Sequence, residues 1–182
     1  MRPPAEAVPF ILLAALITRA GLFLVALPDE HRFFTSDAEG YVALARDLRA
    51  GYQQPESPLF VAGLSRPPGY PLFVAAVLWL TGSLAAVVAM QILLAVATVW
   101  VVYLLGRELL GARAAALGAM VLALDPASVI YTNQLQPEAL FTLLVTCAML
   151  AWVRSQAAGA SSGAAVAGLF LGLAILTRPI AL

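Results

Sequence analysis

Residues 84–105, LAAVVAMQILLAVATVWVVYLL, decide the fold. A helix needs about 20 mostly apolar residues to cross the hydrocarbon core of a bilayer. This stretch supplies them without a single charged side chain. Other apolar stretches of similar length, each with a polar or charged feature, predict further spans at residues 8–27, 114–131, 135–153 and 164–182. We therefore expect an all-α polytopic membrane protein with about five transmembrane helices.

The composition agrees with a membrane protein. The chain is 62% apolar and 11% charged, whereas soluble domains are roughly 45–50% apolar and about 25% charged. A formal net charge of zero gives no case for nucleic-acid binding. The lone cysteine, Cys147, excludes a disulfide within the chain and a cysteine-based zinc site. The first apolar run lacks a clear cleavage site, which favours a retained anchor over a signal peptide.

The topology depends on residues 71–80, PLFVAAVLWL, which are apolar but short. That length favours an interfacial or re-entrant helix over a span. With the N-terminus in the cytoplasm, Arg107, Arg113 and Arg154 then all fall on the cytoplasmic side, as the positive-inside rule expects. Residues 28–68 become an extracytoplasmic first loop. We expect residues 1–182 to form one transmembrane module in the plasma (inner) membrane.

The first loop contains a pattern typical of a surface helix. Ser36 and Glu39 have the spacing of a capping box, and Gly51 is a natural C-terminal stop. The apolar positions between them follow helical spacing: Tyr41, Leu44, Ala45 and Leu48. We predict an amphipathic helix over about residues 37–50 that lies on the outer membrane surface.

Four charged residues are predicted on this outer face: Asp37, Arg66, Glu138 and Arg178. Acids there could bind a divalent metal ion or act as a general base on an acceptor hydroxyl. Arginines could hold a leaving phosphate and stabilise its charge. Each residue also has a simpler interpretation, because the acids suit helix N-termini and arginines anchor helices at the membrane interface. The combination suits transfer of a group from a lipid-linked phosphate.

Two ionisable residues, Arg19 and Asp125, lie inside predicted spans, where such groups are functional candidates by default. Asp125 precedes Pro126, so its other role would be to satisfy backbone groups at a kink. These two residues fit an alternative hypothesis better, namely a non-catalytic polytopic protein such as a transporter or scaffold subunit.

An ordered set of motifs resembles a known family. These are DAEGYVALARDLRAG (37–51), RPPGYPLFVAAVLWLTG (66–82), LLGRELLGARAAALGAMVLALDP (104–126), LQPEALFTLL (135–144) and GLAILTRP (172–179). Together they resemble the N-terminal part of glycosyltransferases of the GT-C fold. More narrowly, they resemble the protein O-mannosyltransferase and aminoarabinose-transferase-like group.

This resemblance implies a sugar donor on polyprenyl phosphate, used on the extracytoplasmic side, and a lipid, glycan or protein acceptor. It implies that Asp37 is catalytic, that Glu138 assists and that Arg66 and Arg178 contact the donor phosphate. Any metal ion would lie at Asp37 and Glu138. Asp29 and Glu30 compete with Asp37 for the catalytic assignment. Family members continue with further spans, so we expect this chain to be an N-terminal fragment that is inactive alone.

Overall fold

The computed structural model describes residues 4–49, 66–159 and 161–178, and within these ranges all regular structure is helical. The elements are η1 (Pro4–Ala7), α1 (Val8–Ala26), η2 (Glu30–Phe33), α2 (Ala38–Arg49), α4 (Gly69–Thr81), α5 (Leu84–Leu110), α6 (Ala112–Leu124), α7 (Pro126–Thr132), α8 (Glu138–Ala158) and α9 (Ser161–Thr177). The all-α prediction is confirmed. Arg2, Gly51 and the last residues of the predicted fifth span lie outside the described residues.

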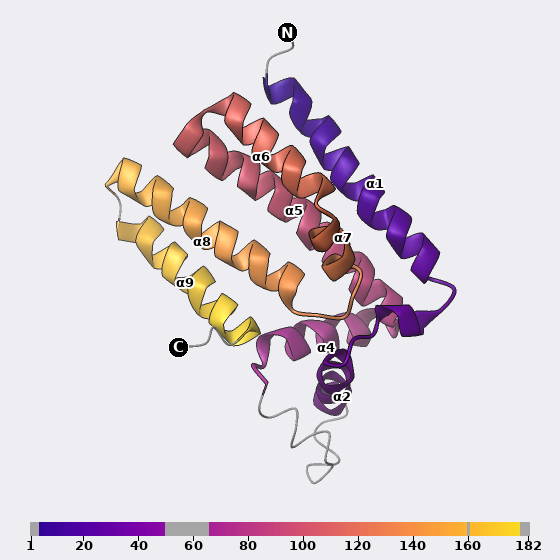
Figure 1. Cartoon of the computed structure of the whole chain (residues 1–182). Helices are drawn as coiled ribbons and strands as arrows, with labels where there is room; N and C mark the ends of the chain where they lie inside the picture. Colours follow the sequence, from indigo (N-terminus) through magenta and orange to yellow (C-terminus); the bar gives the residue numbers. More distant parts are fainter. Residues whose placement is uncertain (1–3, 50–65, 160, 179–182) are drawn as a thin grey trace.

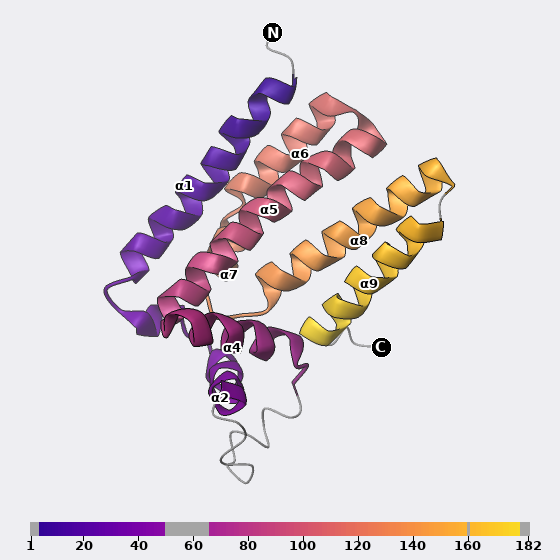
Figure 2. The same ribbon diagram turned by 180° about the vertical axis from the view of Figure 1, so that it is seen from behind.

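The long helices form a bundle in which α5 packs against α1, α6 and α8, and α9 packs against α8 (Figure 1). Seen from behind, the same helices run side by side and α4 lies across one end of them (Figure 2). In the described part, α1, α5 and α8 are long and apolar enough to cross a membrane, and the bent pair α6–α7 adds a fourth candidate. The chain is therefore a polytopic membrane protein.

The expected number of five spans is supported only in part. The fifth, predicted over residues 164–182, corresponds to α9, a helix of 17 residues. At about 1.5 Å per residue this helix is about 26 Å long, which is at the lower limit for crossing a hydrocarbon core of about 30 Å. The structure gives α9 as a shorter apolar helix beside α8.

The predicted span over residues 114–131 is broken between α6 and α7, which meet at 55°. Proline lacks a backbone N–H and cannot continue the hydrogen-bonding ladder of α6, so the helix ends before Pro126. Asp125 then caps α7, because its Oδ2 atom accepts a hydrogen bond of 2.6 Å from the backbone N–H of Ser128. Asp125 thus satisfies a backbone group at the kink, which is the local role considered for it in the sequence.

Arg19 donates hydrogen bonds to backbone carbonyls at the α6 side of this break. Its side chain is fully buried and donates hydrogen bonds to the carbonyl oxygens of Ala123 at 2.9 Å and Leu122 at 3.3 Å. It also donates to the Ser128 hydroxyl at 2.8 Å. Both carbonyls lie in the last turn of α6, where intrahelical donors run out, and the Leu122 carbonyl also accepts a 3.4 Å hydrogen bond from the Asp125 N–H. Arg19 therefore fixes α1 to the broken helix.

The short apolar helix predicted over residues 71–80 corresponds to α4, which has 13 residues. Gly82 ends it in the left-handed conformation, with φ of 71°, and this turns the chain into α5. The Ser83 side chain accepts a hydrogen bond from the backbone N–H of Ala86 and caps α5. The chain thus reverses direction sharply, which leaves α4 across the end of the bundle (Figure 1).

The amphipathic helix predicted over residues 37–50 is α2, and it packs on α4. Its buried face includes Tyr41, Leu44 and Ala45. Its start differs from the prediction. The first helical bond runs from Tyr41 N–H to the Asp37 carbonyl at 3.5 Å, and no hydrogen bond among the described residues forms a capping box between Ser36 and Glu39. Glu39 is exposed on the surface of α2.

Candidate active site

The first ion pair of the site joins the loop before α4 to the start of α2. Arg66 Nη2 lies 3.2 Å from Asp37 Oδ1, and Arg66 Nη1 donates a 3.1 Å hydrogen bond to the Asp37 carbonyl oxygen. The guanidinium also stacks over the Tyr41 ring, 4.6 Å from its centroid. Arg66 therefore bonds both the side-chain carboxylate and the backbone carbonyl of Asp37.

Gly40 makes this position of Arg66 possible. A Cβ atom at Gly40 would lie 2.9 Å from Arg66 Nε and 3.0 Å from Arg66 Cζ. Such distances are well inside the optimal separation of about 3.5–4.0 Å between heavy atoms. The absence of a side chain at residue 40 lets the guanidinium lie against α2.

The second ion pair joins the start of α8 to the end of α9. Arg178 Nη1 lies 3.4 Å from Glu138 Oε1. The other carboxylate oxygen, Oε2, is buried and has no hydrogen-bond partner among the described residues. The end of α9 lies directly on α4, since a Cβ atom at Gly69 would lie 2.7 Å from the Leu176 carbonyl oxygen. This close contact fixes where Arg178 leaves the helix.

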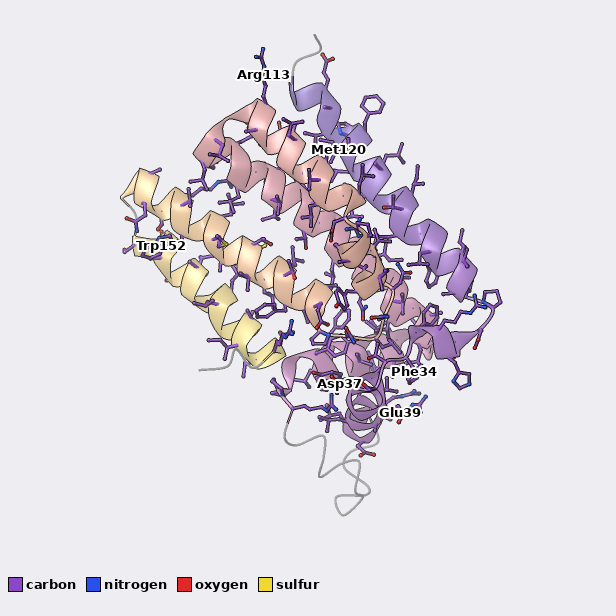
Figure 3. The ribbon with its side chains drawn as sticks, viewed as in Figure 1. Phe34, Asp37, Glu39, Arg113, Met120 and Trp152 are labelled. Atoms are coloured by element: carbon purple, nitrogen blue, oxygen red, sulfur yellow. The ribbon has the colours of Figure 1, made fainter. Side chains whose placement is uncertain are left out.

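A cavity of about 300 Å³ brings the two pairs together. Its lining residues come from α2, from the segment before α8 and from the end of α9: Asp37, Tyr41, Gln136, Pro137, Glu138 and Arg178. Arg66 is outside this lining but contacts two residues of it, Asp37 and Tyr41. Figure 3 shows Asp37 at the end of the bundle opposite Arg113. The four charged residues singled out in the sequence thus meet at one end of the molecule.

A second cavity of about 280 Å³ lies beside α7 and shares Glu138 with the first. It also borders Asp125, Ser128 and Tyr131, and it extends to Thr98 of α5. Most of its remaining wall is apolar. Glu138 therefore stands between a polar cavity at the end of the bundle and a more apolar one between the helices.

Several polar residues near the site were missed in the sequence. Gln136 lines the first cavity and donates a 2.9 Å hydrogen bond to the Thr35 hydroxyl. Tyr70 is fully buried beside Tyr41, with ring centroids 5.1 Å apart. Burial, reinforced by the charge of Glu138 and by Tyr41, raises the pKa of the Tyr70 hydroxyl well above its ordinary value, so this group is protonated. The sequence signal that could have identified these residues is a polar side chain within or beside an apolar run.

The competing acids Asp29 and Glu30 lie elsewhere. Asp29 caps η2 by accepting a 3.1 Å hydrogen bond from the His31 N–H, and its carboxylate lies 3.7 Å from Arg32. Neither acid lines the cavity that holds Asp37. Within the described ranges, no group of three or more His, Cys, Asp or Glu side chains could hold a metal ion. Asp37 and Glu138 are the acids that face the cavity.

The comparisons with known proteins identify the family. Residues 65–182 match the model of the family described as dolichyl-phosphate-mannose-protein mannosyltransferase. Neither the curated proteins nor the solved structures contain a match. The matched range includes Arg66, Glu138 and Arg178, and Asp37 joins them through its contacts with Arg66. Since more than half of the chain matches, it belongs to the dolichyl-phosphate-mannose-protein mannosyltransferase family of membrane glycosyltransferases.

Proposed function

We propose that this chain forms the N-terminal catalytic module of an enzyme that transfers a sugar from a polyprenyl-phosphate donor to a hydroxyl group. The acceptor is a lipid, glycan or protein, and dolichyl-phosphate-mannose is the donor that the family name indicates. The observation that carries the proposal is the cavity in which Asp37, Glu138 and Arg178 meet. Acids and arginines at one cavity are the groups that such a transfer requires.

In the proposed reaction, the acceptor oxygen attacks the anomeric carbon of the sugar. The bond from that carbon to the donor phosphate breaks, and its electron pair leaves with the phosphate. Asp37 takes the proton of the acceptor hydroxyl as a general base. Arg178 and Arg66 hold the phosphate, which carries more charge as it leaves. Arg178 suits this role because its side chain is half exposed at the cavity.

Glu138 assists by holding Arg178 and by facing both cavities. Two cavities that share one carboxylate suit a reaction with two substrates. The polar cavity matches the phosphate and sugar, and the more apolar one matches a group that enters from the bilayer. A divalent metal ion, if the reaction uses one, would bind Asp37 and Glu138.

We further propose that the site faces the extracytoplasmic side of the plasma membrane and that the N-terminus is cytoplasmic. Arg107 and Arg113 flank the turn between α5 and α6, and Arg154 pairs with Glu108 at 3.1 Å near the same end. This is the end opposite Asp37 (Figure 3). Arginine-rich short loops favour the cytoplasmic side.

The test is the Asp37→Asn variant in the full-length protein, assayed for sugar transfer from a polyprenyl-phosphate donor. Loss of a general base typically lowers the rate about 10²–10⁴-fold. Asp29→Asn makes the same chemical change at the acid that caps η2 and should keep normal transfer. Normal transfer by Asp37→Asn would refute the catalytic assignment, and equal losses in both variants would point to a general defect of the loop.

A further inference from the structure

Gln91 is a buried amide in the otherwise apolar first half of α5. Its Nε2 group donates to the carbonyl oxygens of Thr132 at 3.1 Å and Gln134 at 2.6 Å. Its Oε1 atom lies 2.7 Å from the Tyr70 hydroxyl. Backbone carbonyls only accept hydrogen bonds, so the amide nitrogen must face them, and the Tyr70 hydroxyl must donate to Oε1. The orientation of the amide is thus fixed by its three partners.

One side of Gln91 leads to the Glu138 half of the cavity. Thr132 ends α7, and the segment from Asn133 to Pro137 carries Gln136 and Glu138 into the cavity. This segment has no regular helix or strand to satisfy its backbone carbonyls. Gln91 bonds the Gln134 carbonyl inside the segment and the Thr132 carbonyl directly before it.

The other side of Gln91 leads to the Asp37 half. The Tyr70 ring meets Tyr41 edge to face at 5.1 Å. Tyr41 lines the cavity and carries the Arg66 guanidinium on its ring, and Arg66 in turn holds Asp37. An unbroken series of contacts therefore runs from Asp37 through Gln91 to the segment before Glu138.

We propose that Gln91 is a positioning residue that keeps the Asp37–Arg66 half of the site in register with the Glu138–Arg178 half. Its side chain lines neither cavity, so it acts through Tyr70 and the Thr132 and Gln134 carbonyls. Because an amide inside an apolar helix is costly unless it is fully bonded, all three bonds are kept together. This inference rests on the proposed function.

The test is a double-mutant cycle on sugar transfer, with rates expressed per folded protein. Gln91→Leu should lower kcat about tenfold or more, since a misplacement of about 1 Å can cost about 100-fold. In a Glu138→Gln background, Gln91→Leu should lower the residual rate by much less, because the group that it positions is already lost. Ser155→Ala is the control, since the buried Ser155 hydroxyl lines neither cavity and bonds its own helix at Trp152.

A purely structural role for Gln91 would lower the rate by the same factor in both backgrounds, as any effect of Ser155→Ala should, and that result would overturn the inference. If Gln91→Leu does not fold, Tyr70→Phe removes one hydrogen bond of the series and should show the same dependence on Glu138. A wild-type rate in Glu138→Gln alone would instead refute the role of Glu138 in the proposed function. The two failures are therefore distinguishable.

Discussion

Gly40→Ala should damage the site while leaving the fold intact. The new Cβ atom would lie 2.9 Å from Arg66 Nε, so the guanidinium must retreat by about 0.5 Å or more to reach ordinary contact. This movement takes Arg66 away from both its bonds to Asp37. A hydrogen bond to a charged group contributes about 1.5–3 kcal/mol. If that contribution is lost from the transition state, transfer should fall roughly tenfold to hundredfold.

The stability of the same variant should change little or increase. Alanine inside a helix is favoured over glycine by roughly 0.5–1 kcal/mol, and an exposed ion pair contributes about 0.2–1 kcal/mol. The two effects offset each other. The assay compares initial transfer rates with the thermal midpoint of the purified protein in detergent. Gly118→Ala is the control, because a Cβ atom there has nothing within 4 Å. Wild-type transfer by Gly40→Ala would refute the reasoning.

Three further outcomes are expected. In a cysteine-free background, Glu39→Cys should react with an impermeant thiol reagent added to intact cells and Arg113→Cys should not; the reverse labelling would contradict the proposed orientation. Gly69→Ala should destabilise the protein by about 1–3 kcal/mol, measured by thermal unfolding, because the new methyl group meets the backbone of α9; an unchanged midpoint would refute the close contact. Asp125→Ala should cost about 1 kcal/mol through loss of the helix cap while transfer persists, and abolished transfer in folded protein would assign Asp125 a direct role.

Much of the fold was predictable because hydropathy reports directly on burial in a bilayer. The clean span at residues 84–105 appears as α5, Leu84–Leu110, and the short apolar run appears as α4. The fifth span was predicted to start at residue 164, whereas α9 begins at Ser161, because hydropathy does not mark where a helix begins. The capping box failed for a similar reason. Ser36 and Glu39 have the correct spacing, but the start of α2 is determined by tertiary contacts of Asp37.

The charged residues of the candidate site could be selected from the sequence, but the ion pairs that they form could not. Charge and position indicated Asp37, Arg66, Glu138 and Arg178, yet no spacing rule says which arginine faces which acid. Arg66 meets Asp37 because α2 folds back on α4 and Gly40 leaves room. These are long-range contacts, which local sequence patterns do not encode. The role of Gln91 was missed for the same reason, because its partners are long-range contacts. The sequence itself shows only that a lone amide lies in an apolar span.

Arg19 and Asp125 show how the structure separates the two function classes left open by the sequence. A transporter uses intramembrane charges to bind cargo, so those groups must be available to it. The Arg19 guanidinium is instead bonded to carbonyls at the end of α6 and to Ser128, and Asp125 caps the helix that follows. Both residues thus satisfy backbone groups that the break at Pro126 exposes. By contrast, the carboxylates and Arg178 at the end of the bundle face an open cavity, which is where the proposed transfer from a lipid-linked phosphate would take place.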